Sequence, residues 1–199
     1  MKAAAAPPPA NLTARIAQRV RDLRAAAALS LDDLATRSAV SRSMISLIER
    51  GETSPTAVVL EKLATGLGVS LASLFEPPAV SGDPVSRRAG QPSWRDPESG
   101  YVRRNVSPGG FPSPIQIVEV SFPPRARVAY ETGPRTPRVH QQVWVLDGTI
   151  EVTVGDVRHR LDAGDCLALT LEQPLAYFNP TRKRARYAVV LSAEGGGGR

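Results

Sequence analysis

The sequence predicts a two-domain α plus β chain, with an N-terminal domain of five short helices and a C-terminal all-β domain built as a sandwich or closed barrel. Apolar residues recur at helical spacing over residues 11–76, with capping residues between the segments. Prolines, glycines and serines crowd residues 77–100, which is typical of a linker. Short apolar or alternating segments separated by turn residues fill residues 101–192. The ends, 1–10 and 193–199, are Ala/Pro-rich and Gly-rich, and we expect disordered tails there.

Length and composition narrow the class of protein. The chain has 199 residues, 42% of them hydrophobic, and a formal net charge of +6, which is a globular composition with a basic balance. No apolar run approaches the roughly 20 residues of a membrane helix, so we expect no membrane association. The single cysteine, Cys166, excludes an intramolecular disulfide and fits a reducing cytoplasm. We expect its side chain to be buried.

Capping residues and glycines delimit the five expected helices. Ser30 and Ser41 stand at N-cap positions, and Gly51 and Gly68 follow the last apolar residue of a segment. In Ser54-Pro55, the proline suits the first position of a helix. The expected helices cover residues 12–27, 31–37, 41–50, 55–67 and 71–75.

The second and third of these helices carry the most specific motif in the chain. Its pattern is filled by Asp33, Leu34, Ala35, Ser38, Val40, Ile45, Ile48, Glu49 and Gly51. These residues resemble the helix-turn-helix domain of the lambda-repressor/Cro-like (XRE) family, and the resemblance extends from about Ile16 to Phe75. It implies a sequence-specific transcriptional regulator that inserts the second helix of the pair into the major groove of double-stranded DNA.

The outer face of this recognition helix supplies the predicted base contacts. Ile45 and Ile48 share one face and should lie in the core, whereas the opposite face is polar. Arg42 is the strongest candidate, because arginine can bind guanine O6 and N7 with two hydrogen bonds. Solvated surface arginines are the alternative, which the surrounding pattern disfavours. The DNA-contacting residues predicted here are Ser41, Arg42, Ser43, Ser46, Leu47 and Arg50.

Two further features follow from the resemblance. Ser30, Ser54 and Thr56 lie at helix starts, where free N–H groups bind phosphate, so we expect them to contact the DNA backbone. Arg24 and Glu49 match family positions that form an ion pair between the first helix and the recognition helix. That pair would have a structural role.

The C-terminal part alternates short strands and turns. Turn pairs such as Asp147-Gly148 and Ala163-Gly164 separate the segments. The expected strands cover residues 115–122, 128–130, 143–146, 149–154, 166–169 and 185–191.

Residues 141–165 resemble the first motif of the cupin family, and residues 174–179 resemble its second motif. The resemblance implies a jelly-roll barrel. Metal-binding cupins hold their ion with two histidines and a glutamate from the first motif and a histidine from the second. Here Gln141 and Leu175 stand at the glutamate and second-motif histidine positions, and 135–137 contains no histidine. We therefore expect no metal, no cofactor and no catalytic residues.

What remains is a barrel that could enclose a small effector. Alternation places Gln141 inside and its neighbour His140 on the opposite face. Arg135 or Arg138 could hold a ligand carboxylate. The predicted effector pocket consists of Tyr130, Arg135, Gln141, Val143, Val145, Leu175, Tyr177 and Asn179.

Together these features predict a cytoplasmic regulator that binds a palindromic operator as a homodimer and senses a small molecule through its cupin domain. Two alternatives stay open at this point. The cupin domain could be an enzyme with an accessory helix-turn-helix domain, or it could serve only for dimerisation.

Overall fold

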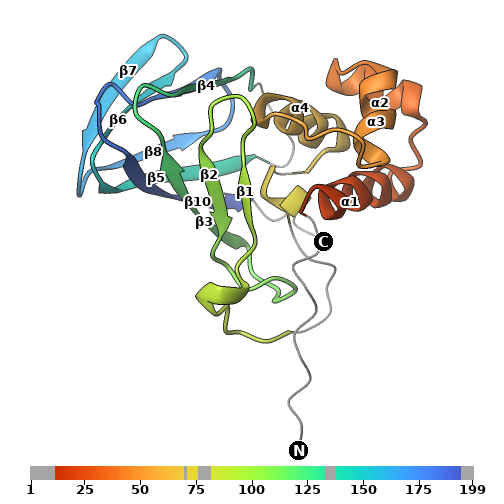
Figure 1. Ribbon diagram of the computed structural model, residues 1–199, viewed down its shortest axis with the longest axis horizontal. Helices are drawn as coiled ribbons and strands as arrows, with labels where there is room; N and C mark the ends of the chain where they lie inside the picture. The colour runs from red at the N-terminus through yellow and green to blue at the C-terminus, as the bar shows by residue number, and fades with distance from the viewer. Residues whose placement is uncertain (1–11, 70, 76–81, 133–137, 194–199) are drawn as a thin grey trace, which may run out of the picture.

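The computed structural model describes residues 12–69, 71–75, 82–132 and 138–193, which form a helical domain beside a β domain (Figure 1). The four α-helices are α1 (Leu12–Ala26), α2 (Leu31–Ser38), α3 (Arg42–Glu49) and α4 (Ala57–Leu67). The expected fifth helix, Leu71–Phe75, is a 3-10 helix, η1, so the expectation of five α-helices is corrected to four. A five-residue segment leaves room for few i→i+4 bonds, and 3-10 geometry suits such short pieces. None of the described helices is long and apolar enough to cross a membrane.

The helix boundaries follow their caps, with one correction. The Ser30 hydroxyl caps α2, and the Ser41 hydroxyl caps α3 by accepting a hydrogen bond from Met44 N–H at 3.3 Å. The cap of α4 is Thr56 rather than the predicted Ser54, because the Thr56 hydroxyl accepts the Val59 N–H at 3.4 Å. The helix therefore begins after Pro55 rather than at it.

The helical core forms where the apolar periodicity predicted it. Val20 of α1, Leu34 of α2 and Leu60 of α4 have no exposed surface. Ile45 and Ile48 of α3 are buried among them, as expected. Because one side of α3 packs in this core, its polar side faces solvent.

The β domain consists of two antiparallel sheets rather than one closed barrel. The six-stranded sheet has the order β1-β2-β3-β10-β5-β8, and the four-stranded sheet has the order β4-β9-β6-β7. The strands of the first sheet are β1 (Ser93–Arg95), β2 (Val102–Asn105), β3 (Ile115–Phe122), β10 (Ala185–Ala193), β5 (Val139–Asp147) and β8 (Cys166–Thr170). Those of the second are β4 (Arg127–Tyr130), β9 (Leu175–Phe178), β6 (Thr149–Val154) and β7 (Val157–Asp162).

The two sheets pack face to face. The rings of Tyr177 in β9 and Tyr187 in β10 stack with their centroids 5.6 Å apart and their planes 5° from parallel. Val143 of β5 and Val152 of β6 are fully buried between the sheets. The domain is thus a two-layer sandwich. Five of the six predicted strands end within two residues of the observed bounds, whereas β5 begins four residues before its predicted start at 143.

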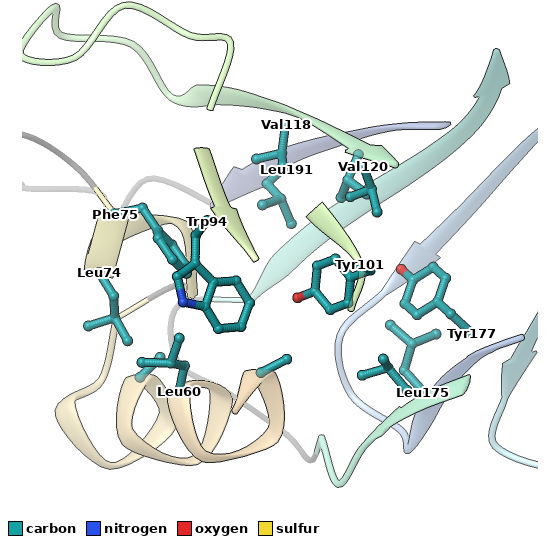
Figure 2. Close-up of a cluster of buried hydrophobic side chains, with 14 of the residues drawn as sticks. Leu60, Leu74, Phe75, Trp94, Tyr101, Val118, Val120, Leu175, Tyr177 and Leu191 are labelled. Atoms are coloured by element: carbon teal, nitrogen blue, oxygen red, sulfur yellow. The ribbon is translucent and has the colours of Figure 1, made fainter. Parts of the chain in front are cut away.

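The segment expected to be a linker, 77–100, is packed in its described part. It contains the 3-10 helix η2 (Arg88–Gly90) and strand β1. Trp94 of β1 lies between Phe75 of the helical domain and Tyr101, with ring centroids 5.5 and 5.8 Å away (Figure 2). This aromatic cluster joins the two domains, so the linker expectation is corrected for these residues.

A buried carboxylate makes a second connection between the domains. Asp96, 2% exposed, follows β1 and accepts a hydrogen bond from Ala57 N–H at 2.8 Å. Ala57 is the first residue of α4, so the negative charge lies at the positive end of that helix. The second carboxylate oxygen accepts the Ser99 N–H at 2.7 Å. The β domain thereby caps a helix of the helical domain.

Candidate nucleic-acid interface and ligand pocket

The N-terminal half of α3 presents its predicted residues to solvent. The Arg42 side chain is 65% exposed, and its Nε lies 3.3 Å from Asp32 Oδ1 in α2. The hydroxyls of Ser41 and Ser43, both exposed, lie 3.2 Å apart. The helix start therefore offers one cation and two hydroxyls at one accessible end.

A second arginine, Arg50, directly follows α3 as its C-cap residue. Arg50 donates to both oxygens of Glu52, at 2.7 Å from Nε and 3.0 Å from Nη2, and it also donates to the Ser46 hydroxyl. The hydrogen bond from Arg50 lowers the pKa of the Glu52 carboxyl. Leu47 is half-buried beside them. Exposed ion pairs of this kind contribute little free energy, so DNA phosphates or bases can displace Glu52.

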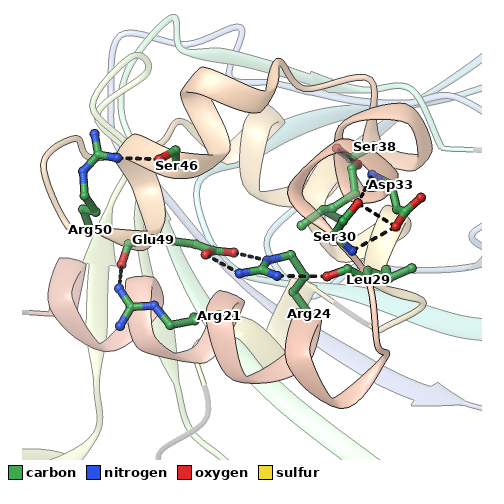
Figure 3. Close-up of polar contacts among 10 residues, drawn as sticks. Arg21, Arg24, Leu29, Ser30, Asp33, Ser38, Ser46, Glu49 and Arg50 are labelled. Atoms are coloured by element: carbon green, nitrogen blue, oxygen red, sulfur yellow. Dashed lines mark hydrogen bonds and ion pairs between the residues drawn. The ribbon is translucent and has the colours of Figure 1, made fainter.

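The recognition helix is fixed to α1 by the predicted ion pair (Figure 3). Arg24 donates from Nε and Nη2 to the two carboxylate oxygens of Glu49, at 2.6 and 2.8 Å. Its Nη1 donates to the Leu29 carbonyl at 2.9 Å, and Arg21 donates to the Glu49 carbonyl. Glu49 is buried, so this two-bond pairing sets the orientation of α3 relative to α1.

The predicted phosphate contacts at helix starts have acidic neighbours. Ser30 N–H donates to Asp33 Oδ2 at 2.9 Å, which completes a capping box. Asp96 occupies the start of α4 beside Thr56, and Ser54 is exposed ahead of that helix. Phosphate contact by Ser30, Ser54 and Thr56 stays a prediction, and these carboxylates count against it.

A cavity of about 60 Å³ lies between the sheets at the end covered by the helical domain. Four of the eight predicted pocket residues line it: Tyr130, Gln141, Leu175 and Tyr177. Val143 and Val145 are fully buried but fill the core away from the cavity. Arg135 lies outside the described residues. This corrects the predicted pocket, because alternation identifies the inner face of a strand but not which inner residues border a void.

Asn179 is also placed differently from the prediction. Its side-chain amide donates to the carbonyls of Pro123 at 3.0 Å and Lys183 at 2.8 Å, and Thr181 N–H donates to its Oδ1 at 3.0 Å. It has no exposed surface. These hydrogen bonds hold two chain turns together, and Asn179 does not border the cavity.

The cavity has walls that the sequence prediction missed. Tyr101 reaches it from the residue before β2, Arg103 from β2 and Tyr187 from β10, and Glu61 and Leu71 reach it from the helical domain. The spacing of Tyr101 and Arg103 would have indicated a shared face, had residues 102–105 been assigned as a strand. The contribution of Glu61 depends on how the domains pack, which no local pattern reports.

The tyrosines of the cavity are neutral hydrogen-bonding groups. Burial raises the pKa of Tyr101 to about 12, and it also raises the pKa of Tyr177 and Tyr187 above the ordinary value. The hydroxyls of Tyr101 and Tyr130 lie 3.2 Å apart, and Gln141 Nε2 donates to the Tyr177 hydroxyl at 2.6 Å. The cavity therefore combines apolar walls with protonated hydroxyls.

The position expected for a metal-binding glutamate serves this network instead. Gln141 is buried and faces the cavity, while His140 is exposed on the opposite face, as alternation predicts. Within the described residues, no group of three or more His, Cys, Asp or Glu side chains is placed to hold a metal ion.

The helix α3 faces solvent, is capped at its start and packs on the core of the helical domain. This domain is joined to a β sandwich that contains a cavity. The arrangement is that of a two-domain helix-turn-helix protein. Residues 20–74 match the family model described as Helix-turn-helix, which identifies a helix-turn-helix domain in this part of the chain. The chain is 28% identical over 171 residues to the HTH-type transcriptional regulator SutR of Escherichia coli, covering 85% of this chain and 89% of SutR.

Two other proteins support the same assignment. The crystal structure of an HTH_3 family transcriptional regulator from Vibrio cholerae superposes with a TM-score of 0.74 at 25% identity, covering 92% of this chain and 97% of that one. The HTH-type transcriptional regulator DdrOP3 of Deinococcus deserti is 33% identical over 69 residues, which is 35% of this chain and 54% of that protein. The similarity to SutR and to the Vibrio cholerae regulator extends through both domains.

Proposed function

We propose that the chain is a transcriptional regulator that binds a specific DNA operator through α3, as a homodimer in the cytoplasm, under the control of a small effector bound in a cupin-type β domain. The observation that carries the proposal is the exposed polar face of α3, oriented by the buried Arg24–Glu49 pair. An α-helix fits the major groove of B-DNA, and helix-turn-helix proteins insert the N-terminal residues of this helix first.

The roles of the α3 residues follow from their positions. Arg42 leaves Asp32 to bind guanine O6 and N7, and Ser43 and Ser46 donate to base edges or phosphates. Leu47 provides apolar contact to a thymine methyl. Ser41 and Arg50 flank this surface at the two ends of the helix and bind backbone phosphates.

The outer face of the six-stranded sheet supports the proposed dimer. Trp144 is 50% exposed there, with Ile115 and Ile117 exposed on β3. In the register of β10, Ala188 lies between Trp144 and Glu119, and Val190 lies between Gln142 and Ile117. The apolar side chains of this face therefore alternate with two polar ones. Such a face fits a two-fold interface with a second copy of the chain. Cys166, which we expected to be buried, is exposed next to Trp144.

The position of the cavity supports a regulatory role, because a ligand in it would lie against the helical domain. Its walls come from both domains, since Glu61 of α4 and Leu71 of η1 border it together with strands of both sheets. An effector in contact with both domains has different affinities for different domain arrangements and thereby shifts the DNA-binding equilibrium. This also distinguishes the proposal from a β domain that serves only for dimerisation.

Fluorescence anisotropy tests the proposal. The purified chain is titrated onto the DNA directly upstream of its own gene, onto genomic fragments that it selects, and onto a scrambled duplex at one physiological salt concentration. We expect the selected duplex to bind at least about a thousandfold more tightly than the scrambled one. Equal affinity for selected and scrambled duplexes would contradict the proposal.

A further inference from the structure

Arg103 is a buried cation whose charge is not fully paired. Its exposure is 6%, and it borders the cavity of the β domain. Its guanidinium lies over the Phe75 ring, with Cζ 5.2 Å from the ring centroid. Nε and Nη2, however, are buried without a hydrogen-bond partner in the described part of the chain. Buried unsatisfied donors on a charged group are costly, so a native structure that retains them points to a missing partner.

The two unpaired nitrogens are the ones that bind carboxylates elsewhere in the same chain. Arg24 uses Nε and Nη2 to bind the two oxygens of Glu49, and Arg50 uses the same pair for Glu52. These nitrogens form one edge of the planar guanidinium, with two parallel N–H groups that match the spacing of a carboxylate. In Arg103 this edge is left for a group that is not part of the described protein.

From this geometry we propose that the cavity of the β domain binds a small monocarboxylate, whose carboxylate accepts two hydrogen bonds from Arg103 Nε and Nη2. The proposal names the ligand class of the effector site in the proposed function. It rests on the proposed function only for the effect of the ligand on DNA binding. It moves the anion-binding role from the predicted Arg135 and Arg138 to a residue of β2.

The surroundings of Arg103 define the ligand further. A cavity of about 60 Å³ exceeds the roughly 10–15 Å³ that one water needs, but it restricts the ligand to a few non-hydrogen atoms. Tyr101 and Tyr130 also border the cavity, and because their hydroxyls hydrogen bond to each other, one O–H of the pair is left to donate to the anion. Glu61, itself buried, contributes a carboxylate to the same cavity and disfavours a second negative charge on the ligand. Monoanions are therefore preferred over dianions.

The site also connects a ligand to the helical domain. The ring beneath Arg103 belongs to Phe75 of η1, and Trp94 packs against the same ring. A carboxylate that draws the guanidinium toward itself changes the contact with Phe75. Trp94 fluorescence reports that change once the exposed Trp144 is replaced by phenylalanine.

Thermal unfolding of the full-length protein, in the absence of DNA, tests the proposal. Sodium acetate, propionate and pyruvate are compared with sodium chloride at equal ionic strength, with neutral acetamide and with disodium succinate. We expect the monocarboxylates to raise Tm and to change Trp94 emission in the Trp144→Phe protein, whereas acetamide and chloride have no effect and succinate has less. Monocarboxylate Kd values should rise at least about tenfold in Arg103→Met, because the charged hydrogen bonds are lost.

Two variants keep the result interpretable. Arg104→Met removes the neighbouring arginine of β2, whose Nη2 donates to Glu119 at 2.5 Å, and it should bind monocarboxylates like the wild type. Without ligand, Arg103→Met should unfold at the same temperature as the wild type or higher, because it removes an incompletely paired buried charge. The proposal is overturned if no monocarboxylate raises Tm above the chloride control, if Arg103→Met responds like the wild type, or if succinate binds as well as acetate. A bound monocarboxylate that leaves DNA affinity unchanged would contradict the effector role in the proposed function and not the binding site.

Discussion

Three arginines present the same edge of the guanidinium group, formed by Nε and Nη2, in three different environments. Arg24 is largely covered and pairs with buried Glu49, Arg50 is exposed and pairs with Glu52, and Arg103 is buried with that edge unpaired. The environment of each arginine determines what its edge does. The pair of Arg24 orients a helix, the pair of Arg50 is weak enough to be exchanged, and the edge of Arg103 needs an additional anion.

Replacing Arg42 by alanine tests the main predicted base contact. Arg42→Ala should weaken specific DNA binding by about 1–3 kcal/mol and relax the preference for the contacted guanine, without unfolding the domain. Arg158→Ala is the matched control, because Arg158 is equally exposed but lies in β7 of the other domain. Anisotropy titrations on the selected duplex give both values. An unchanged preference in Arg42→Ala would remove Arg42 from the base-reading surface.

The cavity tyrosines predict a loss of stability in alkali. Because burial raises the pKa of Tyr101 from 10 in the unfolded chain to about 12 in the fold, its contribution is fully present below pH 10 and is lost as the pH rises toward 12. The free energy of unfolding should fall by about 1.4 kcal/mol per pH unit for each such tyrosine over that interval. Urea unfolding at stepped pH, with Tyr101→Phe for comparison, measures the slope. A variant with the same slope as the wild type would show that Tyr101 ionises freely in the folded state.

Sequence patterns predicted the orientation of single side chains well where that orientation depends on local alternation. The opposite facing of His140 and Gln141 follows from strand geometry alone. Arg103 was missed because the short strand β2 has weak apolar alternation and because its cavity forms only when β2, β9, β10 and α4 come together. A void between distant elements leaves no local pattern in the sequence.

At the scale of elements, α3 depends on its connection to α1. Replacing Arg24 by methionine leaves the Glu49 carboxylate buried beside an apolar side chain, so the free energy of unfolding should fall by about 3 kcal/mol. The double variant Arg24→Met/Glu49→Leu removes the stranded charge and should recover most of the loss. Denaturant titrations compare the three proteins. A loss below about 1 kcal/mol in the single variant would mean that the pair behaves like an exposed one.

The start of α4 depends on a side chain from the β domain. Asp96→Ala leaves the buried Ala57 N–H without its acceptor and should cost about 1–2 kcal/mol of stability. Asp83→Ala is the control, because Asp83 also accepts a backbone hydrogen bond, from Val85 N–H at 2.9 Å, but is exposed and local. Urea unfolding followed by circular dichroism compares the two. Equal losses would mean that Asp96 acts only as a local turn residue.

The sequence predicted the regular elements to within a few residues wherever caps and apolar periodicity agree, as for α2, α3 and β3. It placed the start of α4 too early because Ser54-Pro55 satisfies the same local rules as Thr56. It predicted a linker at 77–100 because Pro/Gly content reports the absence of long regular elements. Such content cannot reveal that Trp94 and Asp96 pack against the helical domain.

At the scale of the whole molecule, we propose that the outer face of the six-stranded sheet forms the dimer interface. Trp144→Arg replaces the largest exposed apolar side chain of that face by a charge and should convert the proposed dimer into a monomer. Trp144→Phe keeps the face apolar and should stay dimeric. Sedimentation velocity at several concentrations distinguishes the two states. A wild-type monomer, or a dimer that survives Trp144→Arg, would place the interface elsewhere.

The most direct test of the whole account is dimethyl sulfate protection of guanine N7 on the selected duplex, which reports contacts in the major groove. We predict protected guanines in two half-sites about one helical turn apart for the wild type, and loss of that protection in Arg42→Ala at concentrations that still saturate the DNA. Arg158→Ala should give the wild-type pattern. A bound protein that protects no guanine in the major groove, or an Arg42→Ala pattern identical to the wild type, would contradict recognition through α3.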